Sequence, residues 1–159
     1  MDKQLMIKKY SEALEEGRAA IFAGAGLSVG AGFVDWAGLL ADVAAALNVR
    51  IEPTTNLVEL AQYYVNDTHS TTALSQAILD AFPSSTMPTE NHRILSSLPI
   101  KTYWTTNFDK LIERALEAAS KSYDVKALPE RLAISKSNCD VVVYKMHGDI
   151  DNPDKTILT

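Results

Sequence analysis

The chain has 159 residues, 47% of them hydrophobic and 22% charged, and its net charge is -5. Its length predicts one domain, and its composition is that of a globular protein with enough apolar residues for a core. A mildly acidic chain without a cluster of lysines and arginines is not expected to bind nucleic acid or an anionic membrane. One cysteine, Cys139, excludes an internal disulfide and a cysteine-based zinc site. No signal peptide or long apolar span is visible, so the default expectation is a cytoplasmic protein.

The first hundred residues alternate one short strand with several helices. Apolar spacing predicts a helix over 2–17, ended by Gly17, and the apolar run 18–23 predicts a buried strand. After a glycine-rich turn, apolar side chains at helical spacing predict helices over 36–47, 56–65, 71–82 and 89–98, the last with Thr89 as its N-cap. This stretch is too long for one crossover between strands, so we expect a small helical subregion over about 39–98 beside a sheet.

Beyond Pro99 the pattern changes to strands separated by a helix. It predicts a strand over 100–105, a helix over 110–119, a strand over 140–146, and the start of a further strand at Ile157 and Leu158. Strands that alternate with helices predict an α/β fold, a Rossmann-like parallel sheet with helices on both faces, in one domain over 1–159. In such folds ligands bind beyond the carboxyl ends of the strands, so the turns that follow the three strands should converge on one crevice.

The stretch A-I-F-A-G-A-G-L-S-V-G-A-G, residues 20–32, places four glycines after the first strand. Gly24 and Gly26 fit the start of the dinucleotide-binding pattern G-x-G-x-x-G, in which backbone amides approach a phosphate, but residue 29 is valine. A tight turn that binds no ligand is the alternative. A P-loop is excluded, because no Gly-Lys-Ser/Thr sequence follows.

The same stretch also matches G-x-S-x-G at residues 26–30, the turn that exposes a nucleophilic serine in hydrolases. Asp140 and His147 follow Ser28 in the order that such a triad requires. The turn also needs an oxyanion donor from an earlier strand-to-helix loop, and no strand is predicted before Arg18. A serine hydrolase is therefore disfavoured, and the alternative is that Ser28 caps a helix or bonds a phosphate.

Three motifs together resemble the sirtuin superfamily. G-A-G-L-S-V-G-A-G-F-V-D-W, residues 24–36, resembles its opening motif, which reads G-A-G-I-S and then A-G-I-P-D-F-R. T-T-N-F-D at 105–109 is similar to the sirtuin T-Q-N-I-D motif, and K-M-H-G-D at 145–149 is similar to the segment with the catalytic histidine. Ala37 replaces an arginine of the deacylating sirtuins, Thr106 replaces a glutamine, and the four-cysteine zinc module is missing. This pattern is similar to the sirtuin-like domains of bacterial antiphage defence proteins, which hydrolyse NAD.

The resemblance implies roles for individual residues. Asn107 would orient the ribose or the attacking water, and His147, with an ordinary pKa of ~6.5, would be the general base. The remaining NAD-binding positions would be Gly24, Ala25, Gly26, Ser28, Asp35, Trp36, Thr106 and Asp109, with the first three turned toward the diphosphate and a helix near Trp36 adding favourable polarity. The alternatives are an asparagine in an ordinary turn, a histidine at a strand end, and an N-cap at Asp109.

The function that the resemblance implies is hydrolysis of the nicotinamide–ribose bond, with NAD as substrate and no metal. A protein deacylase and a non-catalytic module that senses NAD or ADP-ribose are the alternatives. Sirtuin-like domains continue with further strands after the histidine, so we expect the chain to be the N-terminal part of a longer protein. Further domains and assembly into a homo-oligomer are the expected partners, without contacts to nucleic acid or membrane.

Overall fold

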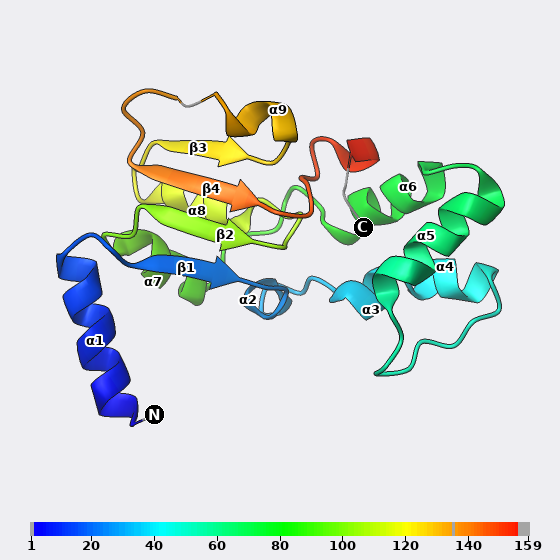
Figure 1. Cartoon of the computed structure of the whole chain (residues 1–159), viewed down its shortest axis with the longest axis horizontal. Helices are drawn as coiled ribbons and strands as arrows, with labels where there is room; N and C mark the ends of the chain where they lie inside the picture. The colour runs from blue at the N-terminus through cyan, green and yellow to red at the C-terminus, as the bar shows by residue number, and fades with distance from the viewer. Residues whose placement is uncertain (1, 135, 156–159) are drawn as a thin grey trace.

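The computed structural model describes residues 2–134 and 136–155, and it shows an α/β fold built on one parallel sheet (Figure 1). The strands lie in the order β1-β2-β4-β3. Their bounds are Ala20–Ala23 for β1, Thr102–Thr105 for β2, Tyr123–Lys126 for β3 and Val141–Lys145 for β4. All three strand pairs are parallel, with Ala23 opposite Thr105 and Thr105 opposite Lys145. The predicted α/β class with a parallel, Rossmann-like sheet is confirmed.

Helices connect the strands and form a separate group beyond the sheet (Figure 1). Their bounds are Lys3–Glu15 (α1), Gly26–Val29 (α2), Trp36–Leu39 (α3), Ala41–Ala46 (α4), Leu57–Thr68 (α5), Thr72–Ala81 (α6), Glu90–Ser97 (α7), Leu111–Ala118 (α8) and Pro129–Leu132 (α9), with a 3-10 turn η1 at Pro153–Lys155. α7 begins at the predicted cap, Thr89, whose hydroxyl lies 2.8 Å from Nδ1 of His92. The predicted strand start at Ile157 and Leu158 lies outside the described residues.

Several predicted elements differ from those observed. The helix predicted over 36–47 is two short helices, α3 and α4, because the backbone leaves the helical conformation at Leu40, whose side chain is fully buried. The glycine-rich turn contains a helical turn, α2, that the sequence pattern did not predict. β3 and α9 were also not predicted; together they fill the connection between α8 and β4.

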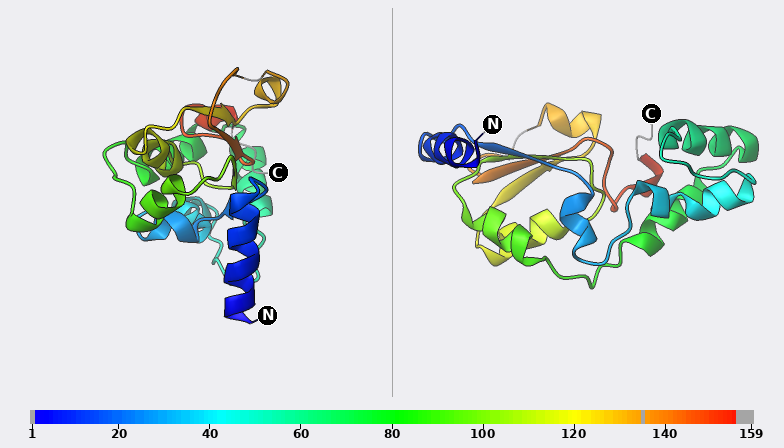
Figure 2. Two further views of the ribbon diagram at one scale, coloured as in Figure 1. Left: turned by 90° about the vertical axis from the view of Figure 1, so that its left-hand side faces the viewer. Right: turned by 90° about the horizontal axis from the view of Figure 1, so that it is seen from below.

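The two faces of the sheet have different environments. α7 and α8 cover one face, seen from below in Figure 2, where Tyr103, Val143 and Leu116 are buried. On the other face Phe22 is 67% exposed and Trp104 is 38% exposed. Trp104 stacks on Tyr144 with ring centroids 4.1 Å apart. The prediction that β1 is a buried strand is therefore wrong, because β1 is the last strand of the sheet within the described residues and only its alternate side chains face the helices.

The helices α3 to α6 form their own hydrophobic cluster at the carboxyl edge of the sheet (Figure 1). Leu40, Ala61 and Ile78 are fully buried in it. Phe108, from the turn after β2, is part of the same cluster, so this turn is packed between the sheet and the helical group. α7 instead packs on α8. Among the described residues no helix is both long and apolar enough to cross a membrane.

Candidate functional site

Three turns meet beyond the carboxyl ends of β1, β2 and β4, as predicted. The amide of Thr106 donates to the carbonyl oxygen of Ala23 at 3.2 Å, which joins the turn after β2 to the end of β1. The amide of Met146 donates to Thr105 at 2.8 Å, and the amide of Ile150 donates to Phe108 at 3.1 Å. Parallel pairing explains this convergence, since the carboxyl ends of all four strands lie at the same edge.

Asn107 fastens the turn after β2 to the glycine-rich turn. Its Nδ2 donates to the carbonyl oxygen of Gly24 at 3.1 Å and to Oγ of Ser28 at 2.9 Å. Because a carbonyl only accepts hydrogen bonds, the contact with Gly24 fixes which end of the amide carries the nitrogen. Among residues 2–134 and 136–155 no donor reaches Oδ1, so the side chain offers a ligand an acceptor and not a donor.

Ser28 and Asp109 continue this network into the start of α8. The Ser28 hydroxyl donates to Oδ2 of Asp109 at 2.7 Å, and Oδ1 of Asp109 accepts from the amide of Leu111 at 2.9 Å. Both side chains are buried. In a serine hydrolase the nucleophilic hydroxyl donates to a histidine, whereas here it donates to a carboxylate and accepts from an amide. The serine-hydrolase hypothesis for Ser28 does not fit this geometry.

The helix that begins directly after Gly24 and Ala25 is α2, within the glycine-rich turn, and not the helix near Trp36 that we had expected to add polarity there. Ala25 is its N-cap, and the amides of Ser28 and Val29 donate to the carbonyl oxygen of Ala25. A Cβ added at Gly26 would meet no atom within 4 Å in the part of the chain that the structure describes. Protein packing therefore gives no reason for glycine at position 26.

Trp36 lies between the turn after β2 and the loop after β4. It opens α3, where Oδ1 of Asp35 caps the helix by accepting from the amide of Gly38 at 2.9 Å. The Trp36 ring centroid is 5.5 Å from that of Phe108 and 5.4 Å from that of His147, the latter in an edge-to-face arrangement. The ring of Trp36 is thus in contact with the candidate base, His147.

His147 is half-buried and held by packing. Its Nδ1 is buried and has no hydrogen-bond partner among the described residues. Burial lowers the pKa of His147 below its ordinary value, which keeps the ring neutral and able to accept a proton near pH 7. The next residue, Gly148, has φ +107°, a conformation that L side chains rarely adopt, so the chain turns away directly after the histidine.

A narrow pocket of about 20 Å³, room for about one water molecule, lies at the centre of the site. Its lining includes seven predicted site residues, which are Ala25, Ser28, Asp35, Trp36, Thr106, Asn107 and Asp109. Gly24 and Gly26 adjoin it through the backbone of Ala25, and His147 adjoins it through Trp36. Every predicted site residue is therefore in this one region, although Gly24, Gly26 and His147 do not themselves line the narrow pocket.

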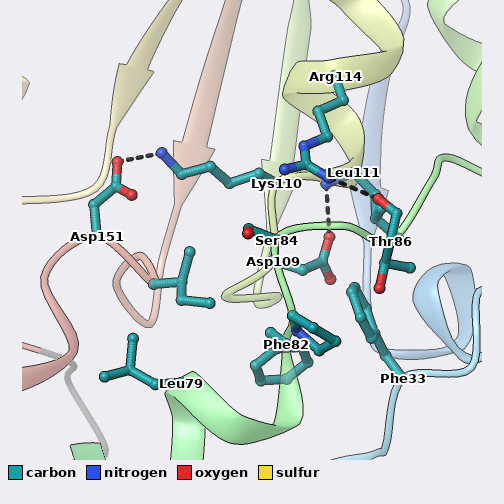
Figure 3. Close-up of a pocket in the computed structure, with 12 residues that line it drawn as sticks. Phe33, Leu79, Phe82, Ser84, Thr86, Asp109, Lys110, Leu111, Arg114 and Asp151 are labelled. Atoms are coloured by element: carbon teal, nitrogen blue, oxygen red, sulfur yellow. Dashed lines mark hydrogen bonds and ion pairs between the residues drawn. The ribbon is translucent and has the colours of Figure 1, made fainter.

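A wider pocket of about 310 Å³ shares Asp109 and Phe82 with the narrow one (Figure 3). Apolar side chains, among them Phe33 and Leu79, form one wall. Arg114 donates to the carbonyl oxygen of Thr86, and Lys110 pairs with Asp151 at the rim (Figure 3). The sequence analysis missed Phe82 and Arg114, which lie outside the motifs, and Lys110, which directly follows the T-T-N-F-D motif.

One further residue that the sequence analysis did not single out is Lys145, at the end of β4. It lies inside the quoted segment K-M-H-G-D, and its side chain is completely buried beside Asp109 and Asp149. An ionisable residue at the end of an apolar strand was the available signal. No group of three or more histidine, cysteine or acidic residues that could hold a metal ion occurs within the described ranges.

Comparisons with known proteins show which proteins this chain resembles. Residues 101–159 match the family model described as a SIR2-like domain. The chain is 49% identical over its whole length to the NAD(+) hydrolase ThsA of Enterococcus faecium, of which it covers 34%. It is 49% identical over 99% of its length to the NAD(+) hydrolase ThsA of Cytobacillus dafuensis, and it covers 32% of that relative. It is 47% identical over 98% of its length to the NAD(+) hydrolase ThsA of Bacillus cereus (strain MSX-D12), and it covers 33% of that relative. The chain thus spans about one third of the length of these curated relatives, and its residues 101–159 are similar to SIR2-like domains.

Proposed function

We propose that this chain is the NAD-hydrolysing domain of a longer protein and that it cleaves the nicotinamide–ribose bond. The observation that carries the proposal is that the glycine-rich turn, Asn107 and Trp36 line one pocket, which His147 adjoins through its contact with Trp36. The similarity to proteins named NAD(+) hydrolase, over essentially the whole chain, supports it. A role in antiphage defence, which the sirtuin-like motifs imply, and the cytoplasmic location expected by default belong to the same proposal.

The reaction requires one bond to form and one to break. The oxygen of a water molecule bonds to the anomeric carbon of the ribose, the carbon–nitrogen bond breaks, and its electron pair stays on the ring nitrogen of the departing nicotinamide. His147 takes the proton that the water loses, for which its neutral form is needed. Oδ1 of Asn107 accepts a hydrogen bond from the water or from a ribose hydroxyl and thereby orients it. The products are ADP-ribose, nicotinamide and a proton.

The diphosphate is assigned to the glycine-rich turn. Gly26 has open space where a Cβ would be, so a phosphate can approach the backbone there. Thr106 lies beside this turn, and its hydroxyl is 4.0 Å from the position of a Cβ on Gly24. Ser28 acts indirectly in this proposal, because its hydroxyl is already bonded to Asp109 and Asn107. The nicotinamide ring would lie at the mouth of the narrow pocket beside Asp35, Trp36 and Asp109, since the pocket itself has room for about one water molecule.

Residues 1–159 are proposed to form one SIR2-like domain with a helical subregion of about 39–98. The rest of the longer protein would supply further domains, and assembly into a homo-oligomer is part of the proposal. The lengths of the curated relatives support the presence of further domains, since the chain covers 34% of the relative from Enterococcus faecium.

The test is nicotinamide release from NAD by the full-length protein and two variants. His147→Ala removes the proposed base, while His69→Asn changes an exposed histidine that ends α5 with φ 52°, a conformation asparagine tolerates. We expect release by the wild type and His69→Asn and a loss of at least about 100-fold in His147→Ala. Release that needs an acyl-lysine peptide would identify a deacylase. NAD binding without any release would identify a sensing module, and equal release by all three proteins would remove His147 from the mechanism.

A further inference from the structure

A fully buried ammonium group lies between the two turns that carry Asn107 and His147. Lys145 is the last residue of β4, two positions before His147, and its side chain has no exposed surface. Its Nζ lies 2.9 Å from the carbonyl oxygen of Phe108 and 2.6 Å from that of Asp109. The ammonium therefore donates directly to the backbone that follows Asn107.

The same ammonium faces two buried carboxylates. Nζ is 3.0 Å from Oε1 of Glu113, in the first turn of α8, and 2.8 Å from Oδ2 of Asp149, in the loop after His147. Burial disfavours the charged lysine, but the two carboxylates outweigh this and raise the pKa of Lys145 above its ordinary value. The group stays charged near pH 7 and joins three segments, namely the turn after β2, α8 and the loop after β4.

Stability alone does not explain an ammonium at this place. Removing a charge from water costs several kcal/mol, and well-packed apolar side chains often replace buried ion pairs without loss of stability. An apolar side chain cannot, however, hold two backbone carbonyls and two carboxylates at hydrogen-bond distance. Lys145 does this with three donor hydrogens shared among four acceptors.

We propose that Lys145 is a positioning residue for the hydrolysis proposed above, on which this inference rests. Its ammonium fixes the spacing between the Thr106–Asp109 turn and the His147–Asp149 loop, so that Asn107 and His147 act on the same bond of NAD. Lys145 itself does not touch the substrate. A misplacement of reacting groups by about 1 Å can cost 100-fold in rate, so this spacing controls turnover more than binding.

The test replaces the whole charged cluster, so that no unpaired charge is left buried. The variant is Lys145→Met combined with Glu113→Gln and Asp149→Asn. The matched control is Lys126→Met with Asp124→Asn, because Lys126 is also buried, at the end of β3, and its Nζ lies 2.7 Å from Oδ2 of Asp124. Both variants are made in the full-length protein. Turnover, KM and amide hydrogen exchange of a peptide covering residues 147–152 are measured.

In the Lys145 cluster variant we expect kcat to fall about 100-fold with KM changed less than about threefold. The amide of Ile150, which donates to Phe108 across the two turns at 3.1 Å, should exchange at least about tenfold faster, while amides of β2 and β4 keep their protection. The Lys126 control should keep the kcat of the wild type and the amide exchange rates of residues 147–152. A cluster variant that folds with kcat within threefold of the wild type, or equal losses in both variants, would overturn the positioning role. If the wild type releases no nicotinamide, the proposed hydrolysis fails. In that case, amide exchange over residues 147–152 that is the same in the cluster variant as in the wild type would separately overturn the role of Lys145.

Discussion

The two turns with the candidate catalytic side chains hold them in opposite ways. Asn107 is buried, its Nδ2 makes two hydrogen bonds, and its backbone amide makes a third to Oγ1 of Thr105 at 3.0 Å. His147 is half-buried, packs edge-to-face with Trp36, and has a buried Nδ1 without a partner in the described ranges. One side chain is fixed by hydrogen bonds inside the protein, and the other is held by the packing of its ring against Trp36.

This difference matches the tasks proposed for the two residues. A group that orients water or a ribose hydroxyl has to stay in one place, and hydrogen bonds from both amide hydrogens of Asn107 achieve that. A general base has to exchange a proton, and a ring held by packing can change its protonation state without breaking internal bonds. The polar bonds also make Asn107 part of the structure, so the two residues should respond differently to substitution.

Asn107→Ala should give the largest combined effect. It leaves the carbonyl oxygen of Gly24 and the buried hydroxyl of Ser28 without their donors, so we expect the free energy of unfolding to fall by about 1–3 kcal/mol, with loss of turnover. His147→Ala should also lose turnover, but its free energy of unfolding should fall by only about 0.5–1.5 kcal/mol, because the variant loses the contact with Trp36. Urea unfolding of the two variants measures the difference. Equal losses of stability would contradict the contrast between the turns.

The pH dependence of kcat/KM should show that His147 acts in its neutral form. Burial lowers the pKa of this ring, so the acid limb of the profile should have its midpoint below the ordinary value of about 6.5. Trp36→Ala exposes the ring, which raises the pKa toward that value and shifts the midpoint to higher pH. Trp104→Ala, on the open face of the sheet, is the matched control and should leave the midpoint in place. A shift to lower pH in Trp36→Ala would show that Trp36 does not shield His147.

The fold was predictable where a pattern is long or strongly apolar. The run of valines in β4 and the helical spacing of α5, α6 and α8 identified these elements close to their observed bounds. β3 was missed because it has four residues, two of them charged, and becomes a strand only by pairing with β4. An apolar run also does not reveal whether a strand is central or at an edge, which is why Phe22 was wrongly expected to be buried.

The site was predictable at the level of the motifs but not of the bonds between them. Parallel strands bring their carboxyl ends together, so the convergence of three turns followed from the order of the elements. The sequence could not show that both amide hydrogens of Asn107 are used in hydrogen bonds within the protein, since the acceptors on Gly24 and Ser28 are about eighty positions away. Nor could it show that Lys145 faces two carboxylates, because Glu113 comes from α8, which only the fold brings close.

Ser28→Ala tests the link between the glycine-rich turn and Asp109, and it should lower the free energy of unfolding by less than Asn107→Ala does. The variant removes one buried hydrogen bond to each of Asn107 and Asp109, and Asp109 keeps the amide of Leu111, so we expect a loss of about 1–2 kcal/mol. Turnover should be reduced but not abolished, because Asn107 keeps its bond to Gly24. Nicotinamide release and urea unfolding measure both effects. Covalent labelling of Ser28 by a fluorophosphonate would contradict this account and revive the nucleophile hypothesis.

Asp35→Ala should have the smallest effect. It tests the N-cap of α3, the helix that begins with Trp36, whose ring contacts His147. Asp35 is exposed, and its carboxylate caps α3 through the amide of Gly38, so removing the cap should cost about 1 kcal/mol or less. Because α3 begins with Trp36, fraying of this helix loosens the wall behind His147. We expect Asp35→Asn to restore stability, since asparagine is an equally good cap, and a thermal melt of the two variants measures the difference. If both variants melt alike and the acid limb moves equally in both, the charge of Asp35, and not its cap, acts on His147, because both substitutions remove the carboxylate.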